Sequence, residues 1–138
     1  IVLIFVSAEC PVVKGYNERM NELAKAYEAK GIRVVGIDSN VTERVTTIKQ
    51  HAAAVWTFPV LIDRDSKIAD KFGANVTPEA FFLDADNTLV YHGAIDNDRS
   101  GRAVTERFLM TAFDSTLAGK KVDRTSANAF GCSIKRAQ

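Results

Sequence analysis

The sequence predicts an α/β fold, a three-layer α/β/α sandwich in which helices cover both faces of a mixed β-sheet. Apolar β-branched runs alternate with amphipathic segments through the first half of the chain, which is typical of parallel strands joined by crossover helices. Two later apolar runs, at 80–83 and 88–92, are separated only by the polar residues 84–87, which indicates an antiparallel hairpin. A parallel half, a hairpin and a final helix together give a mixed sheet.

The first three elements form a βαβ unit. Residues 1–6 are a continuous apolar run, as expected for a strand that is buried on both faces. Pro11 suits the first position of the helix that follows, and Gly31 lies just beyond its expected end. A second buried strand covers 32–37. Two strands joined in this way are expected to be parallel, with a right-handed crossover.

The remaining elements are shorter. Asn40 and Glu43 have the spacing of a capping box and predict the start of a helix with Val45, Ile48 and Ala52 on one side. The other elements are expected in this order: a strand at 58–62 near a sheet edge because of Pro59, a short helix at 66–72 ended by Gly73, the hairpin, and a last helix from about Ser100 to Leu117.

Composition restricts the function classes. The chain has 138 residues, 46% of them apolar and 25% charged, which suits one domain with a core large enough to fold without a metal or disulfide. A net charge of +1 argues against nucleic-acid binding as the main role. We expect one domain over 1–119, followed by a basic tail over 120–138.

No membrane span or obvious leader is expected. The apolar stretch at 1–6, with Ser7 and Ala8 behind it, is too short to cross a bilayer and lacks a basic leader. Because the chain starts at Ile1 inside an expected strand, we expect a trimmed N-terminus. The compartment stays open between bacterial cytoplasm and periplasm.

The C-terminal tail allows two interpretations. Residues 118–138 hold five basic residues and one acidic residue. Such a segment is commonly a solvated and partly mobile terminus. The alternative is that it folds back over the sheet.

Cys10 is the first candidate for chemistry. It lies where the first strand ends and the first helix begins, so its sulfur faces the positive end of the helix dipole. That position lowers the pKa of a thiol and favours the reactive thiolate. The alternative is a buried, inert cysteine in the core.

With Thr77-Pro78 ahead of the strand at 80–83, this pattern resembles the thioredoxin-like superfamily, in its redoxin branch of AhpC/TSA-type peroxiredoxin-like and thiol–disulfide exchange proteins. The resemblance implies that Cys10 is the reactive cysteine and that Thr77-Pro78 is a cis-proline loop beside its sulfur. It also implies that the helix and strand at 40–62 are a redoxin-type insert.

Several positions depart from the subfamilies. Where thioredoxins carry a second cysteine this chain has Val13, and where copper-delivering members carry one it has Lys14. Ser7 occupies the serine or threonine position of peroxiredoxins, but Leu3 replaces their proline. Their catalytic arginine has no assigned position, and its candidates here are Arg99 and Arg102.

Cys132 is the second cysteine of the chain and follows Gly131 in the basic tail. A resolving thiol condenses with an oxidised or mixed-disulfide cysteine to give an internal disulfide. We therefore expect the tail to deliver Cys132 to Cys10. The alternatives are a purely structural disulfide and an unpaired cysteine in a loose tail.

The resemblance predicts a thiol–disulfide oxidoreductase with Cys10 as nucleophile, Cys132 as possible resolving thiol and Ser7 hydrogen-bonded to the sulfur or to a peroxide oxygen. Pro11 and Thr77-Pro78 are expected to shape the substrate groove. The alternatives are a peroxiredoxin-like peroxidase with antioxidant activity and a non-catalytic binding scaffold. Expected partners are thiol or disulfide proteins, small thiols or peroxides.

No cofactor or metal is expected. His51 and His92 lack neighbouring cysteines or carboxylates at ligand spacing, and the glycines form no phosphate-binding pattern.

Overall fold

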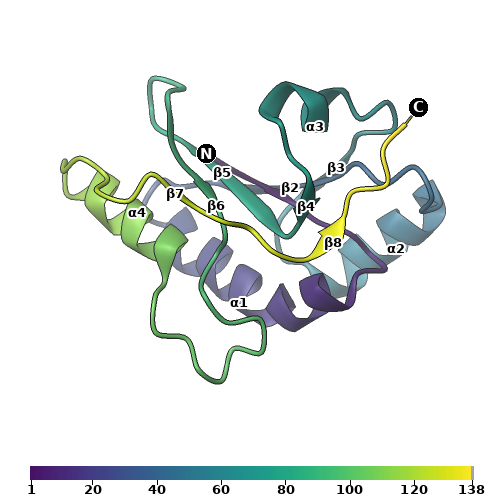
Figure 1. Cartoon of the computed structure of the whole chain (residues 1–138), viewed down its shortest axis with the longest axis horizontal. Coiled ribbons are helices and arrows are strands. Elements are labelled where there is room, and N and C mark those ends of the chain that lie inside the picture. Colours follow the sequence, from purple (N-terminus) through teal and green to yellow (C-terminus); the bar gives the residue numbers. More distant parts are fainter. Residues whose placement is uncertain (138) are drawn as a thin grey trace.

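The computed structural model describes residues 1–137 and shows one six-stranded sheet with a short two-stranded ribbon beside it (Figure 1). The six strands lie in the order β3-β2-β1-β5-β6-β7, and β4 pairs with β8. The strands are β1 (Val2–Phe5), β2 (Val34–Asp38), β3 (Val60–Ile62), β4 (Val76–Thr77), β5 (Glu79–Leu83), β6 (Leu89–Gly93), β7 (Ser126–Ala127) and β8 (Cys132–Ser133). The helices are α1 (Pro11–Glu28), α2 (Val45–Val55), α3 (Lys67–Phe72) and α4 (Phe108–Leu117).

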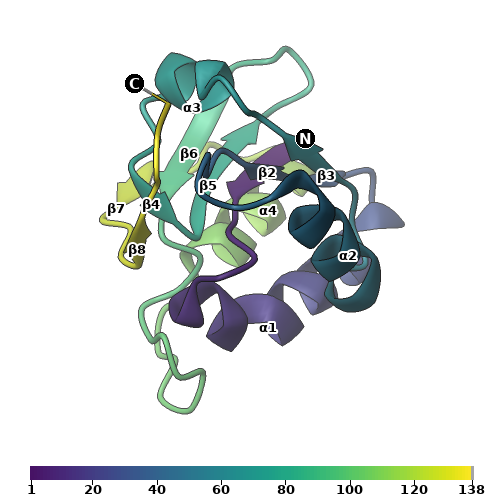
Figure 2. The same cartoon turned by 90° about the vertical axis from the view of Figure 1, so that its right-hand side faces the viewer.

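Helices cover both faces of the sheet, which confirms the predicted three-layer sandwich (Figure 2). One apolar cluster joins α1 and α4 to one face, and its large buried side chains include Tyr16, Met20, Phe82 and Phe113. A smaller cluster on the opposite face packs α3 against Phe5 and Phe81 of the sheet. The site at the start of α1 is therefore held by two packed layers.

The strand directions also agree with the sequence. β1 pairs in parallel with β2, and β2 with β3, whereas β5 runs antiparallel to β1 and to β6. The parallel pair joined by α1 is the predicted βαβ unit, and the hairpin of β5 and β6 is confirmed. β3 lies at the edge of the sheet, where the lost amide of Pro59 costs no ladder bond.

The last helix is shorter than the sequence predicts, because α4 begins at Phe108 rather than near Ser100. A side chain ahead of it holds the intervening backbone in a loop. Asn97 Oδ1 accepts the backbone amides of Thr105 and Glu106 at 3.0 and 3.2 Å. Asparagine side chains compete with helical hydrogen bonds in this way, so an apolar pattern alone overestimates the helix.

The predicted capping box at the start of α2 is wrong. The helix begins at Val45, beyond both of the expected box residues. Glu43 turns its carboxylate to the hydroxyl of Ser7, and the side-chain oxygen of Asn40 accepts the amide of Lys135. Both side chains are used for contacts between distant segments, which local spacing does not reveal.

The tail, described over residues 120–137, folds back over the sheet. β7 adds in parallel to β6, and β8 adds antiparallel to β4. Val122 and Ile134 are buried, at 8% and 7% exposure. The tail therefore follows the second of its two interpretations. Gln138 lies outside the described residues.

Among the described residues, none of the helices is long and apolar enough to cross a membrane.

Candidate active site

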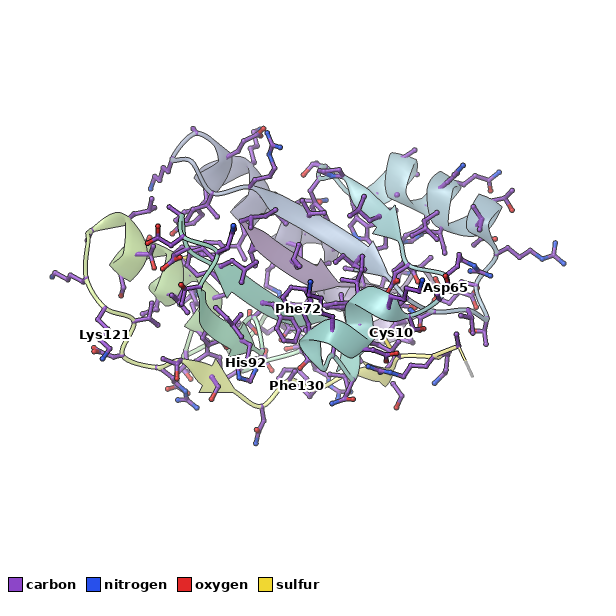
Figure 3. All side chains as sticks on the ribbon, turned by 90° about the horizontal axis from the view of Figure 1, so that it is seen from above. Cys10, Asp65, Phe72, His92, Lys121 and Phe130 are labelled. Carbon is purple, nitrogen blue, oxygen red and sulfur yellow. A yellow bond between two sulfur atoms is a disulfide. The ribbon has the colours of Figure 1, made fainter. Side chains whose placement is uncertain are left out.

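A disulfide joins Cys10, ahead of α1, to Cys132 in β8. The two residues are 122 positions apart, and their Cα atoms lie 6.0 Å from one another. The tail therefore brings Cys132 to Cys10, as expected, and Cys132 is not an unpaired cysteine. Figure 3 shows the tail along one edge of the molecule, from Lys121 past Phe130 to the site at Cys10.

The start of α1 gives Cys10 an electropositive setting. Cys10 is the N-cap residue of this 18-residue helix, Pro11 opens it, and its first turn holds no acidic side chain. The unpaired amides at a helix start favour a negative charge, so they stabilise the Cys10 thiolate once the disulfide is broken. Cys10 is also 4% exposed. It is buried and placed for reactivity at the same time.

The Thr77–Pro78 peptide bond is cis, as the family resemblance implies. Thr77 presents its carbonyl oxygen 3.8 Å from the sulfur of Cys10 and is the register partner of Cys132 in the β4–β8 pair. Gly131 has φ +152°, and a Cβ at this position would collide with the same carbonyl group. Glycine next to Cys132 is therefore needed for the tail to approach the cis-proline loop so closely.

Ser7 is linked to a buried carboxylate. Its hydroxyl donates to Glu43 Oε2 and accepts the amide of Glu9 at 3.2 Å. Glu43 is 3% exposed and also accepts the amide of Ala8 at 3.0 Å. These hydrogen bonds therefore tie Glu43 to Ser7 and Ala8, at the start of the loop that leads into Cys10.

A second carboxyl group lies next to Glu43. Asp38 is 1% exposed, and its Oδ1 accepts the backbone amide of Asn40 at 3.0 Å. Asp38 Oδ2 accepts no hydrogen bond from an N–H or O–H group of the described residues. It can form a hydrogen bond with the Glu43 carboxyl group when one of the two groups carries a proton. Burial and that hydrogen bond raise the pKa of Asp38 to about 7.

The raised pKa of Asp38 predicts a pH effect on stability. The folded chain holds a proton that the unfolded chain loses near pH 4, so this group stabilises the fold at low pH and that contribution falls as the pH rises to about 7. We expect the free energy of unfolding of the wild type to fall by on the order of 1–3 kcal/mol between these pH values, and we expect Asp38→Asn to remove this fall. Urea unfolding from pH 4 to 7.5 measures it, with the exposed Asp86→Asn as control. Parallel profiles for wild type and Asp38→Asn would contradict the shared proton.

Two open pockets flank the disulfide. One, of about 240 Å³, is lined by both cysteines together with Asn40, Glu43 and Lys135. The other, of about 240 Å³, is lined on the Cys10 side by Pro11, Lys14 and His51. Pro11 therefore borders the site, whereas Thr77 and Pro78 are buried, and Thr77 pairs with Cys132 of β8. That these two residues shape a substrate groove stays a prediction.

The two candidate arginines are not part of these pockets. Arg102 is exposed, and the guanidinium of Arg99 lies 5.9 Å from the ring of Phe130. Nothing in the described residues places either side chain against the sulfurs. Arg99 instead packs on the tail two residues before Cys132.

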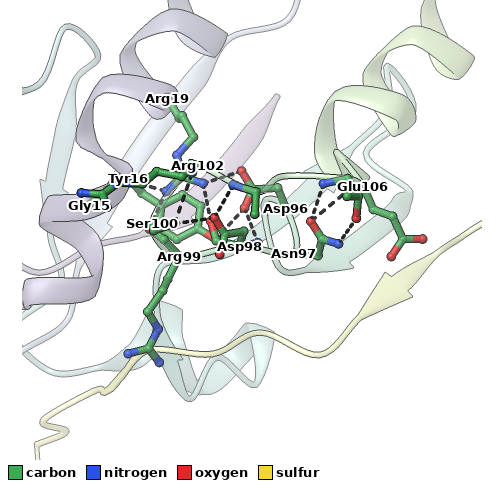
Figure 4. Close-up of polar contacts among 12 residues, drawn as sticks. Gly15, Tyr16, Arg19, Asp96, Asn97, Asp98, Arg99, Ser100, Arg102 and Glu106 are labelled. Atoms are coloured by element: carbon green, nitrogen blue, oxygen red, sulfur yellow. Dashed lines mark hydrogen bonds and ion pairs between the residues drawn. The ribbon is translucent and has the colours of Figure 1, made fainter.

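A polar network holds the loop that carries Arg99 against α1. Arg19 forms an ion pair with Asp96 at 2.6 Å, and Tyr16 donates to the same carboxylate at 2.7 Å (Figure 4). Arg19 also donates to the carbonyl oxygens of Asp98 and Arg99. The network joins this loop to α1 and does not touch the sulfurs.

The buried carboxyl pair of Asp38 and Glu43 was not predicted from the sequence. Asp38 ends a buried strand that points toward Cys10, which was an available signal because the carboxyl ends of parallel strands gather at one sheet edge. The spacing of Asn40 and Glu43 instead suggested a capping box.

In the described residues, no three His, Cys, Asp or Glu side chains are grouped as metal ligands.

The comparisons with known proteins assign the family. The sequence profile described as the AhpC/TSA family matches residues 1–92. The chain belongs to the AhpC/TSA family. The matched region of this AhpC/TSA chain contains Cys10 and the Thr77–Pro78 loop and ends before the tail that carries Cys132. Its mixed sheet with helices on both faces is the thioredoxin-like fold.

Similar proteins extend the comparison. Thiol-disulfide oxidoreductase ResA from a strain of Bacillus cereus is 33% identical over 73 residues, which are 51% of this chain and 40% of that protein. The AhpC/TSA chain thus matches well under half the length of this curated relative.

Two solved structures match 99% of the chain, tail included. A hypothetical protein from Sinorhizobium meliloti 1021 is 34% identical, with a TM-score of 0.89 over 79% of that chain. An uncharacterized conserved protein from Geobacillus kaustophilus is 31% identical, with a TM-score of 0.91 over 76% of that chain.

Proposed function

We propose that this AhpC/TSA protein is a thiol–disulfide oxidoreductase in which Cys10 and Cys132 alternate between a disulfide and two thiols. The observation that carries the proposal is the disulfide itself, formed at the start of α1 beside the cis-proline loop. Similarity to a protein named thiol-disulfide oxidoreductase supports the same chemistry.

The surroundings of the pair suit reversible exchange. Exchange requires a thiolate to attack a disulfide sulfur, so both access and thiolate stability matter. A pocket lined by both cysteines opens beside the disulfide, and the start of α1 favours the thiolate of Cys10. Ser7 and Glu43 border the same pocket, where the Ser7 hydroxyl donates to the Glu43 carboxylate.

Peroxide reduction is the alternative function for the same pair of cysteines. A peroxidase needs a donor that holds the peroxide and polarises its O–O bond. The pocket on both sulfurs is bordered instead by carboxylates, with Lys135 as its basic side chain, and the Ser7 hydroxyl is directed at Glu43. These contacts favour disulfide exchange.

The partners we propose are thiol or disulfide proteins and small thiols. The compared ResA protein is bacterial, and disulfides persist in oxidising compartments, so a bacterial periplasm suits the oxidised chain better than a cytoplasm does.

The test is to equilibrate the native chain with mixtures of reduced and oxidised glutathione and then to alkylate the free thiols. Mass spectrometry of the products counts these thiols. We expect two thiols to appear and disappear together, with the same curve from both directions and unchanged far-ultraviolet circular dichroism. Cys132→Ser is the control, because it keeps a single thiol and cannot show this transition. A disulfide that opens only when the chain unfolds would make it a structural bridge in a non-catalytic scaffold.

A further inference from the structure

The two sulfurs of the disulfide differ in access. Cys10 is 4% exposed and belongs to the main apolar cluster, whereas Cys132 is partly exposed on β8. An external thiolate has to reach one sulfur from the side away from the other. A pocket also borders Cys10 on the Pro11 side, but the greater exposed fraction of Cys132 favours attack at Cys132.

The leaving group gives the same direction. Attack on Cys132 expels Cys10 as a thiolate, whereas attack on Cys10 expels Cys132. Cys10 is the N-cap residue of an 18-residue helix with no acidic side chain in its first turn, whereas Cys132 lies on a two-residue strand and caps no helix. Exchange is faster when the departing thiol has the lower pKa, so the departure of Cys10 is favoured.

The tail is held in place ahead of Cys132. The ring of Phe130 packs against Tyr16 of α1 at 6.3 Å and lies under the guanidinium of Arg99. Gly131 then lies directly against the Thr77 carbonyl group. These contacts do not depend on the disulfide.

The tail is also held beyond Cys132. Ile134 is 7% exposed in the cluster beneath α3, and its amide donates to the Asn75 carbonyl at 2.9 Å. The amide of Lys135 donates to Asn40 Oδ1 at 2.9 Å, and its carbonyl accepts from Val41. Breaking one S–S bond leaves all of these contacts, so Cys132 stays beside Cys10 in the reduced chain.

The docked tail also limits how a partner binds. One backbone edge of β4 is paired with β8 and is not open to another strand. A partner cannot add a strand at Thr77 without removing the tail, so it has to meet Cys132 from the open pocket.

We propose that, within the exchange reaction proposed above and resting on it, external thiols react at Cys132, which carries the mixed disulfide on a tail that stays docked. A thiolate attacks Cys132 Sγ, a new S–S bond forms, the bond to Cys10 breaks, and its electron pair leaves on Cys10. A second external thiolate attacks the external sulfur and releases Cys132. Two external thiols are oxidised to a disulfide, the protein disulfide is reduced, and the two protons pass to its thiols.

This order differs from the one that the sequence predicts. Cys10 remains a nucleophile, but its target is Cys132: its thiolate attacks the mixed disulfide there and closes the internal bond. Cys132 is the sulfur that meets the substrate.

The test is to treat the oxidised full chain briefly with reduced glutathione, quench it in acid, alkylate with maleimide and map the peptides by mass spectrometry. We expect glutathione on Cys132 with maleimide on Cys10 to exceed the reverse pattern at least tenfold at early times. Equal amounts, or glutathione mainly on Cys10, would overturn this proposal but leave the redox couple intact. A disulfide that resists glutathione and dithiothreitol in the folded chain would overturn the proposed function as well.

Amide hydrogen exchange gives an independent readout of the docked tail. The amides of Ile134 and Lys135 are hydrogen-bonded outside the disulfide. We expect their protection to fall on reduction by no more than that of the amides in the β1–β2 pair, which report the lower stability of the whole fold. Loss of protection in both would overturn the fixed tail and indicate a swinging arm.

Discussion

Reduction of the Cys10–Cys132 disulfide is expected to lower the free energy of unfolding by about 4–5 kcal/mol. The bond closes a loop across 122 positions, which removes a large share of the conformations open to the unfolded chain. The tail contacts remain in the folded reduced chain, so the loss comes mainly from the unfolded state. For a chain of 138 residues this corresponds to a fall in Tm of roughly 14–17 °C.

Calorimetry of the chain with and without a reductant measures this fall. Cys132→Ser is the matched control, because a reductant has no bond to break in it and should leave its Tm unchanged. The reduced wild type should unfold near the Tm of this variant. Equal Tm values for oxidised and reduced wild type would contradict the expected loss.

The fold could be predicted from the sequence to a large extent because its signals are local. Residues 1–6 form a continuous apolar run, and the helix behind Pro11 carries a helical spacing of apolar residues, so burial marks both in the local sequence. The hairpin after Pro78 is marked by two apolar runs joined by a short polar segment. α4 was overestimated because the side-chain oxygen of Asn97 competes for backbone amides, an interaction that hydrophobic periodicity does not contain.

The site was predictable in part. The position of Cys10 at a strand-to-helix junction follows from local pattern, and the family resemblance supplied the cis bond at Thr77–Pro78. The path of the tail depends on non-local contacts such as the burial of Ile134 and the fit of Gly131 to a distant carbonyl. The carboxyl pair was missed for the same reason, because Glu43 reaches Ser7 across 36 positions.

The thiol chemistry of the pair is expected to be lost completely when either sulfur is removed. With Cys10→Ser, a mixed disulfide formed on Cys132 has no internal thiolate to release it, so the adduct accumulates. With Cys132→Ser, the remaining thiol is buried and lacks a partner. Both variants should therefore reduce a protein disulfide no faster than the reductant alone.

The most direct measurement is the rate at which the chain catalyses reduction of insulin by dithiothreitol, compared for wild type, Cys10→Ser, Cys132→Ser and Thr111→Ala, a surface control on α4. Hydrogen peroxide in place of insulin tests the peroxidase alternative with the same four proteins. We predict turnover of insulin for wild type and Thr111→Ala, and the background rate for both cysteine variants. Wild-type turnover in either cysteine variant, or no turnover in wild type, would contradict the Cys10–Cys132 redox couple.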